Sequence, residues 1–210
     1  MDHQPETQWR MLWERIGAQG DPHPPYYDLA QRLAEPHRAY HTMRHILHCL
    51  EEMARVRPLA AQPDAMEMAL WYHDAIYDTH AADNEAQSAT LAAHCLRDAS
   101  VPETFVQKVV HLIMATQHRA VAEDPDTRLL VDIDLAILGQ PADIFDAYEQ
   151  HIRQEYAWVS HEAFLEGRTR ILRAFLRRSS IYATDRFHQH YEAQARINIA
   201  RSLKVLEQQA

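Results

Sequence analysis

The stretch MRHILHCLEEMA, residues 43–54, decides the fold class that the sequence predicts. Its apolar residues recur at the i, i+3, i+4, i+7 spacing of one helical face, namely at Met43, Ile46, Leu47, Leu50, Met53 and Ala54. The same spacing returns at residues 106–114 and 171–176, whereas strict alternation is rare and only residues 129–135 are ambiguous. The pattern therefore predicts an all-α chain.

Start and stop signals divide the pattern into roughly eight or nine helices. We expect helices over residues 37–56, 64–78, 161–178 and 185–208, and others that begin after Pro102 and Pro141. Asp64 and Glu67 have the spacing of a capping box at the start of the second of these helices. No repeat or low-complexity tract appears, so we expect a single compact helical domain over residues 1–210. Its core would span about residues 26–178, with the C-terminal helix packed on it.

Composition excludes several classes of function. The 210 residues include 15 His, 4 Gly and 2 Cys, and the formal charge is −9. With so few glycines there is no G-x-G-x-x-G or G-x-x-x-x-G-K phosphate loop, and the negative charge argues against a nucleic-acid partner. The N-terminus lacks the features of a secretory signal, and no apolar run is long enough for a membrane span. Two distant cysteines fit a reducing compartment, so we expect a cytoplasmic protein.

Three histidines share one face of the helix expected over residues 37–56. His41, His45 and His48 fall within about 60° of one another at 100° per residue, opposite the apolar stripe. We therefore expect them to face a cleft or water. The i, i+4 spacing of His41 and His45 lets two imidazoles converge on one ion. The alternative is a solvated polar face that carries several histidines by chance.

A His-Asp pair lies in the aromatic stretch WYHDAIYD, residues 71–78. Because a buried carboxylate without a partner costs several kcal/mol, Asp74 should have a cation beside it. No Lys or Arg occurs between Pro58 and Arg97, so a metal ion is the economical partner for Asp74 and its neighbour His73. The alternative is that Asp74 caps a helix or makes a local hydrogen bond.

Two further acids, Asp132 and Asp134, interrupt the apolar run VDIDLAILG of residues 131–139. Asp134 is the more deeply embedded of the two, with apolar residues on both sides. A metal would explain such acids, and pairing with a remote arginine would explain them equally well. Arg153, Arg168 and Arg196 are available for that pairing.

The order His, His-Asp, Asp on an all-α chain resembles the HD-domain metal-dependent phosphohydrolase superfamily. The match is closest to a bacterial group of predicted HD-type phosphohydrolases. The matching words span nearly the whole chain: EPHRAYH (35–41), HI (45–46), WYHD (71–74), YD (77–78), NE (84–85), SA (88–89), DIDL (132–135), LG (138–139), EY (155–156), GR (167–168), IY (181–182), AR (195–196) and Asn198. The resemblance implies a single helical domain of the HD and phosphodiesterase-like type.

The resemblance also implies a ligand set and a proton donor. Carried over by motif, the metal ligands would be His45, His73, Asp74 and Asp134. The run YHTMRH also resembles the Y-H-N-x-x-H stretch of cyclic-nucleotide phosphodiesterases, which suggests His41 as general acid and His45 as ligand, although Thr42 departs from that pattern. Two alternatives stay open: His41 and His45 could exchange roles, and Asp132 could replace Asp134.

The chemistry of these side chains implies a mechanism. A mixed imidazole and carboxylate site suits Mn, Fe, Co, Ni, Zn or Mg as a divalent ion that activates water. Asp74 would act at the catalytic centre as a ligand, and Glu85 could accept the proton of the attacking water. His118 is a candidate further ligand or phosphate contact, and Arg168 a candidate clamp for an anion. A second metal is compatible with this set.

We therefore expect a metal-dependent phosphohydrolase that cleaves a phosphoester or phosphoanhydride bond of a small molecule, with a nucleotide as the favoured substrate. We expect no nucleic-acid or membrane partner, and the long last helix could pack on a second chain as a homodimer. The main alternative is a catalytically weak HD-fold module that binds a nucleotide or metal for regulation. A weaker alternative is a metal that only holds helices together.

Overall fold

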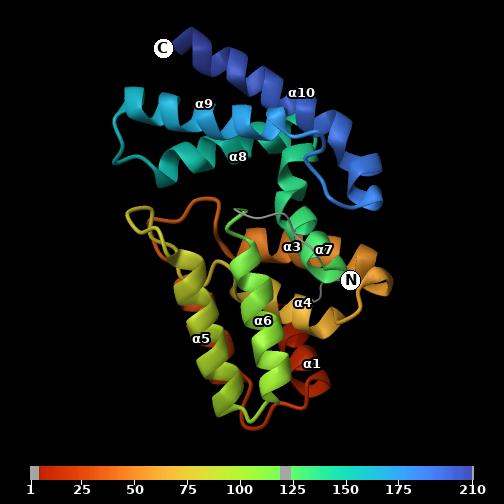
Figure 1. The fold of residues 1–210 in the computed structure, drawn as a ribbon. Helices are drawn as coiled ribbons and strands as arrows, with labels where there is room; N and C mark the ends of the chain where they lie inside the picture. Colours follow the sequence, from red (N-terminus) through yellow and green to blue (C-terminus); the bar gives the residue numbers. More distant parts are fainter. Residues whose placement is uncertain (1–4, 119–123, 210) are drawn as a thin grey trace. The chain divides into compact units, whose positions relative to one another are not determined.

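The computed structural model describes residues 5–118 and 124–209, and all regular secondary structure in these ranges is helical (Figure 1). The elements are α1 (Pro5–Arg15), α2 (His23–Arg32), α3 (Met43–Val56), the 3₁₀ helix η1 (Arg57–Leu59), α4 (Pro63–Tyr72), α5 (Asn84–Asp98), α6 (Glu103–Ala115), α7 (Pro125–Asp134), the 3₁₀ helix η2 (Leu135–Gly139), α8 (Ala142–Glu155), α9 (His161–Arg177) and α10 (Asp185–Gln209). The predicted all-α class is confirmed, and the ambiguous residues 129–135 belong to α7 and η2.

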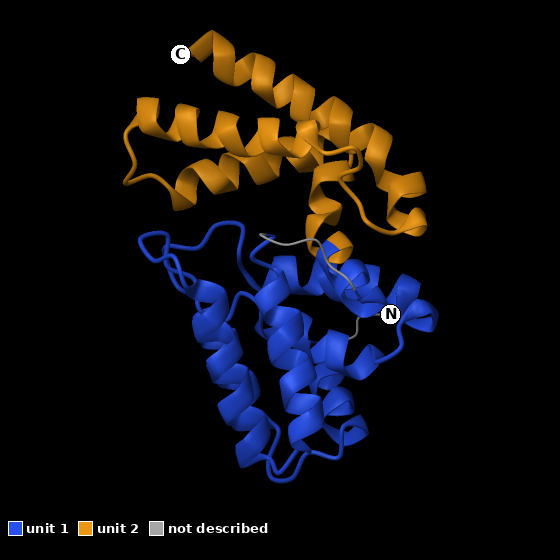
Figure 2. Ribbon diagram, viewed as in Figure 1, with its two compact units in different colours: residues 1–131 blue, residues 132–210 orange. Residues whose placement is uncertain are grey.

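The chain forms two compact units, residues 1–131 and residues 132–210 (Figure 2). Unit 1 contains α1 to α6 and most of α7, and unit 2 contains η2 and α8 to α10. The boundary lies near the C-terminal end of α7 and falls inside the core that the sequence predicts for residues 26–178. The assignment of the whole chain to a single domain stays a prediction.

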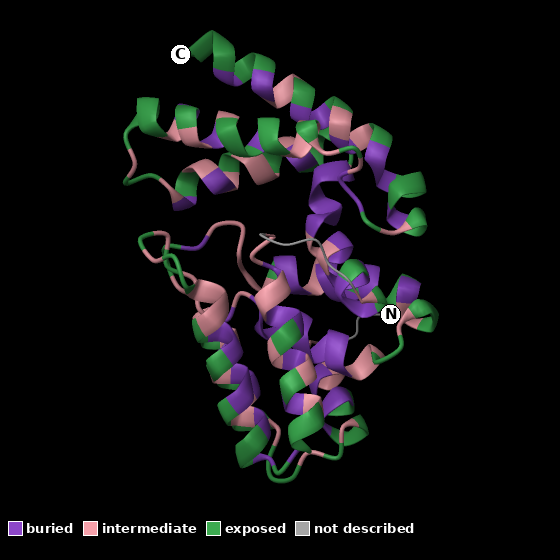
Figure 3. Cartoon of the chain, viewed as in Figure 1, coloured by how far each residue is buried: buried purple, intermediate pink, exposed green. Residues whose placement is uncertain are grey.

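The core of unit 1 is built around α4. Every residue from Ala65 to Tyr72 is buried, and the helix packs against α6, α3, α5 and α1 (Figure 3). A helix that is apolar on all sides is stable only inside a protein, because any exposed face would leave apolar surface in water. The ring of Trp71 meets that of Trp9 edge to face, with centroids 5.6 Å apart. The central position of α4 fixes where the residues that follow its C-terminus must lie.

The predicted start of the helix over residues 37–56 is wrong, because α3 begins at Met43. Thr42, the residue before it, has an extended backbone with φ −119° and ψ 177°, as an N-cap residue does. Residues 37–42 form turns. His41 therefore precedes the helix, and the argument that placed it on one helical face with His45 does not hold.

The helix predicted over residues 64–78 is also too long, and its capping box is wrong. Helix α4 ends at Tyr72, and no side chain caps its N-terminus. Asp64 and Glu67 instead pair with the guanidinium groups of Arg15 and Arg57. Asp64 lies in the first turn of α4, and the N-cap position is occupied by Gln62. Because α4 ends at Tyr72, the His-Asp pair follows the helix instead of lying within it.

The other predicted helix starts are confirmed. Helices α6 and α8 begin directly after Pro102 and Pro141. Helix α9 begins at His161, where the Ser160 hydroxyl accepts a hydrogen bond from the Ala163 N–H at 3.3 Å. Helix α10 covers the range predicted for the last helix, within one residue.

Unit 2 is organised by α10, which packs against η2 and α9. A Cβ atom built on Gly139 would lie 2.5 Å from the Cβ of Tyr191, so the backbone of η2 touches α10 directly. The Asn198 side chain donates to the carbonyl oxygens of Leu138 and Gln140 at 2.9 and 2.8 Å. The last helix is thus an integral part of unit 2.

Candidate metal centre

His45 lies on the buried face of α3, with 3% of its surface exposed. It shares that face with Ile46 and Cys49, so the expectation that these histidines face water or an open cleft is wrong for His45. One turn further on, His48 is half-buried, and burial lowers the pKa of its imidazole. A buried imidazole needs partners for both ring nitrogens.

His73 is the C-cap residue that directly follows α4, and it is 1% exposed. Its Nδ1 lies 2.9 Å from the Leu70 carbonyl oxygen. Because a carbonyl oxygen can only accept, Nδ1 carries the proton, and in the neutral ring Nε2 keeps its lone pair. Metal-binding histidines typically donate their second nitrogen to a carbonyl in this way.

The Nε2 atom of His73 points at two other electron-rich atoms. It lies 3.1 Å from His45 Nε2 and 3.1 Å from Asp74 Oδ2, and the last two atoms are 3.4 Å apart. At metal–ligand distances of about 2.1 Å, donors around one ion lie roughly 3.0–3.4 Å from each other. The three atoms therefore have the spacing of three ligands of one ion.

The environment of the Asp74 carboxylate keeps it ionised. Burial would raise the pKa of Asp74, but the imidazoles of His73, His41 and His45, which lower that pKa when they are protonated, hold it well below its ordinary value. The guanidinium of Arg38 contacts the backbone carbonyl of this residue. The sequence predicts a cation beside Asp74, and the structure places imidazoles there. Imidazoles in their neutral form can also bind a metal.

Cys49 belongs to the same cluster, and the sequence interpretation missed it. Its sulfur is fully buried and lies 3.7 Å from both ring nitrogens of His45. One donor atom each from His45, Cys49 and His73 lie within 4.8 Å of one another. The signal was available, because Cys49 follows His45 at the same i, i+4 spacing that drew attention to His41 and His45.

His41 lies near Asp74 and His45. Its ring stacks on that of Tyr77 with centroids 4.1 Å apart, and its centroid is 5.9 Å from that of His45. Of the two histidines whose roles could be exchanged, the structure brings His45 together with His73 and Asp74.

Two side chains hold the segment that follows Asp74. The Ser88 hydroxyl accepts from the Ile76 N–H at 3.0 Å and donates to the Ile76 carbonyl oxygen at 3.3 Å. The Asn84 side chain makes the same pair of bonds with the backbone of Asp78, at 3.0 and 2.9 Å. The start of α5 thereby fixes the course of this loop.

Asp132 and Asp134 have different surroundings within unit 2. The fully buried carboxylate of Asp132 accepts hydrogen bonds from the N–H groups of Ala183 and Thr184, at 2.7 and 2.8 Å, and from the Thr184 hydroxyl at 2.6 Å. These bonds account for its burial without a metal, which favours Asp134 of the two as a ligand. Asp134 ends α7 and is half-buried, and its role as a ligand stays a prediction.

Glu85 and His118 belong to unit 1, and their predicted roles stay predictions. Glu85 lies in the first turn of α5, half-buried, one turn before Ser88. His118 follows α6 with a left-handed backbone, φ 54°, and is half-buried. Residues 119–123, which come next, lie outside the described ranges.

The candidate anion clamp Arg168 is engaged inside unit 2. Its buried guanidinium pairs with Glu149 and donates to the Tyr148 hydroxyl at 2.9 Å. Burial would lower the pKa of Arg168, yet these two neighbours raise it. Arg153 and Arg196 are likewise bonded within unit 2, to the Tyr156 carbonyl oxygen and to Glu192. The structure thus supports the alternative that these arginines have structural partners.

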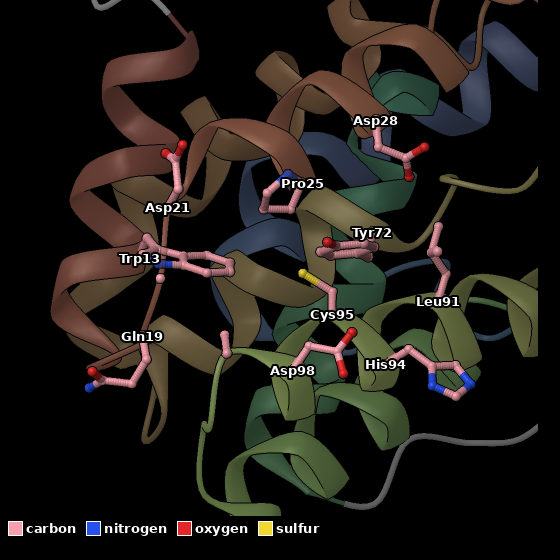
Figure 4. Close-up of a pocket in the computed structure, with 12 residues that line it drawn as sticks. Trp13, Gln19, Asp21, Pro25, Asp28, Tyr72, Leu91, His94, Cys95 and Asp98 are labelled. Atoms are coloured by element: carbon pink, nitrogen blue, oxygen red, sulfur yellow. The ribbon is translucent and has the colours of Figure 1, made fainter.

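A separate cavity of about 390 Å³ opens elsewhere in unit 1 (Figure 4). Trp13, Tyr72, Cys95 and Asp98 are among the residues that line it. None of the residues that line it is His45, His73 or Asp74, although Tyr72 directly precedes His73. This cavity is therefore distinct from the donor cluster.

Comparisons of the chain with protein-family models, with curated proteins and with solved structures return no match. Among the helices of the described residues, none combines the length and apolar character needed to cross a membrane. Over the described residues the protein therefore has an all-helical fold, and unit 1 contains a cluster of His, Cys and Asp side chains that could hold a metal ion.

Proposed function

We propose that this protein is a metal-dependent phosphohydrolase that cleaves a phosphoester or phosphoanhydride bond of a small molecule, with a nucleotide as the favoured substrate. The reaction class comes from the resemblance of the sequence to the HD superfamily. The observation that supports it is the convergence of His45 Nε2, His73 Nε2 and Asp74 Oδ2 at 3.1–3.4 Å from one another.

The donor set fits a divalent ion better than it fits a hydrogen-bonded network. Nε2 of neutral His73 has no proton to give to Asp74, because the Leu70 carbonyl oxygen takes the proton on Nδ1. A cation between these lone pairs would remove their repulsion. His45, His73 and Asp74 would supply three ligands, and Asp134 is the proposed fourth on the basis of the sequence.

The remaining residues have roles that follow from their chemistry. A bound divalent ion would lower the pKa of a water ligand and offset phosphoryl charge. His41, held against Tyr77, would donate the proton to the leaving oxygen. Glu85 would accept a proton from the nucleophile, and His118 would contact the phosphate or the ion.

The test combines metal analysis with a substrate panel. The purified chain should retain a divalent metal and hydrolyse an aryl phosphate monoester, an aryl phosphate diester or a nucleotide. Asp74→Asn should lower the rate at least a hundredfold, because it removes an anionic ligand. Asp143→Asn, an exposed acid in the first turn of α8, is the matched control and should leave the rate unchanged. Hydrolysis by Asp74→Asn in the presence of a chelator would contradict the proposal.

Cys49 supports a second candidate, a metal that is structural or regulatory. Buried thiolates are typical of closed structural zinc sites, and the Cys49 sulfur lies 3.7 Å from the His45 ring nitrogens. In that case Co²⁺-loaded protein would show a thiolate-to-metal absorption band, and Cys49→Ser would abolish this band. The metal would also raise the melting temperature of the protein, and none of the phosphate substrates would be hydrolysed. A thermal-shift response to nucleotides without product formation would favour the regulatory version.

A further inference from the structure

Arg38 is a buried cation outside the donor cluster. Its side chain is 0% exposed, although it lies in the turns between α2 and α3 and not in a helix of the core. Removing a guanidinium group from water is costly, so each of its donors should have a partner. Its partners therefore show what the side chain does.

The guanidinium joins two segments that lie 36 residues apart in the sequence. Nη1 donates to the carbonyl oxygens of His41 and Asp74, at 3.0 and 2.7 Å, and Nη2 donates to that of Ala75 at 3.0 Å. Nε is bonded to the Glu35 carboxylate at 3.1 Å. A single guanidinium group thus binds the backbone of His41, the proposed general acid, and the backbone of Asp74, a proposed metal ligand.

The carbonyl groups that Arg38 binds have a specific need for a donor. Asp74 and Ala75 follow the end of α4, where carbonyl groups have no helical partner and the helix dipole favours a cation. Bonds to both carbonyls fix the peptide groups on either side of Ala75. The peptide orientation in turn sets the direction in which the Asp74 carboxylate leaves the chain.

Arg38 also contacts the aromatic ring that holds His41. Its guanidinium carbon lies 5.5 Å from the centroid of the Tyr77 ring, on which the His41 imidazole stacks. The adjacent His37 reaches the same loop, with its Nε2 2.7 Å from the Tyr77 carbonyl oxygen. The turn before α3 is therefore bonded at successive points to the loop after α4.

We propose that Arg38 is a positioning residue of the metal centre: it holds the backbone of Asp74 and His41 so that the Asp74 carboxylate meets the imidazoles of His45 and His73. This inference rests on the metal site of the proposed function but not on the reaction. It assigns Arg38 to metal affinity and ligand geometry, and not to the stability of the fold.

The test measures Co²⁺ affinity, the visible absorption of bound Co²⁺ and the melting temperature of the metal-free full-length chain. Arg38→Lys keeps the charge but loses the planar fork that reaches three carbonyls. It should weaken Co²⁺ binding at least tenfold, as losses of supporting bonds around metal ligands do, and should shift the absorption band. Arg57→Lys is the matched control, because Arg57 pairs with Asp64 and Glu67 in the same unit.

A melting temperature like that of Arg57→Lys, together with the tenfold loss, would support the proposal. Wild-type affinity and spectrum in Arg38→Lys, or an equal loss in Arg57→Lys, would overturn it. If Arg38→Lys does not fold, Glu35→Gln removes the charge of the carboxylate that accepts from Nε and that also lies 3.7 Å from His37 Nε2. It leaves the three carbonyl groups that Arg38 binds unchanged and should weaken Co²⁺ binding about threefold. Unchanged affinity and spectrum there would overturn the proposal as well.

The same measurements separate this inference from the proposed function. A wild-type chain that binds Co²⁺ but hydrolyses no phosphate, with Arg38→Lys still tenfold weaker, would overturn the reaction and support the role of Arg38. A wild-type chain that binds no Co²⁺ would overturn both.

Discussion

Asp74 in unit 1 and Asp132 in unit 2 are two of the acids that the sequence places in apolar surroundings, and their carboxylates have different partners in the structure. Asp132 accepts three hydrogen bonds, two from backbone N–H groups and one from the Thr184 hydroxyl. The Asp74 carboxylate instead faces the Nε2 atoms of His45 and His73. The first carboxylate is satisfied by the fold, whereas the second has the surroundings of a metal ligand.

The comparison shows that burial alone does not identify a functional acid. Both residues interrupt apolar sequence, so hydropathy cannot distinguish them. The distinction lies in the partners, since N–H groups can donate protons to a carboxylate and the lone pair of a neutral imidazole cannot. Variants at these positions test whether the two acids differ as their partners imply.

Asp74→Ala should have the largest effect, on metal affinity. Four-ligand zinc sites supply about 10–16 kcal/mol in total, so one ligand is worth about 3 kcal/mol, or roughly two orders of magnitude in affinity. Co²⁺ titration of Asp74→Ala should show this loss, while Asp132→Ala should bind Co²⁺ like the wild type. Equal losses in the two variants would remove the distinction between the acids.

Asp132→Ala should have the next largest effect, on stability. It leaves the N–H groups of Ala183 and Thr184 without their acceptor directly before α10, and we expect the free energy of unfolding to fall by about 2 kcal/mol. Urea unfolding of the metal-free chain measures the change. Asp143→Ala, at an exposed position of α8, is the control. A drop no larger than that of the control would contradict the structural role.

Thr184→Val tests one of the three hydrogen bonds that Asp132 accepts. It removes only the hydroxyl donor at 2.6 Å and leaves the two backbone donors of Asp132 in place. We expect a loss of about 1 kcal/mol in the same unfolding assay. A loss as large as that of Asp132→Ala would mean that the hydroxyl, and not the backbone, carries most of the interaction.

The smallest effect that we predict concerns pH, and its sign follows from Asp132. Burial raises the pKa of Asp132 above its ordinary value of 3.8, despite the hydrogen bonds that lower it. The folded state then binds a proton more tightly than the unfolded state, so this contribution to stability is present below pH 3.8 and is lost as pH rises through the raised pKa.

The measurement compares wild type and Asp132→Asn by urea unfolding between about pH 3 and pH 7, a range that brackets the ordinary and raised pKa values of an aspartate. The stability of the wild type relative to the variant should decrease as the pH rises, because the variant cannot ionise at this position. Asp143→Asn provides the baseline for the remaining acids. A wild-type advantage that increases with pH would show that the hydrogen bonds outweigh burial.

Much of the fold could be predicted from the sequence. Helical spacing gave the all-α class, and the prolines at positions 102 and 141 marked helix starts within one residue. A partner beside Asp74 could be predicted from chemistry, because no Lys or Arg nearby in the sequence could balance a buried acid, and a metal in that place stays a prediction. These inferences depend on local sequence alone.

The failures arose where long-range contacts override a local pattern. Residues 37–42 are predicted to be helical but lie in turns, from which Arg38 bonds to carbonyl groups in the loop after α4. Asp64 has capping-box spacing, but Arg15 and Arg57 lie close enough to pair with it. Cys49 was missed because the two cysteines were interpreted only as a sign of a reducing compartment, although Cys49 follows His45 at the i, i+4 spacing.

Gly139 has a consequence for comparing this chain with distant sequences. Because a Cβ there would lie 2.5 Å from that of Tyr191, even alanine requires η2 and α10 to separate. Substitution at this position is therefore constrained by geometry whatever the chemistry of the donor cluster. In a distant protein that keeps the metal-binding residues and carries a larger side chain at this position, η2 and α10 must pack differently. The residue at position 139 therefore indicates whether the helix packing is conserved, independently of the metal-binding residues.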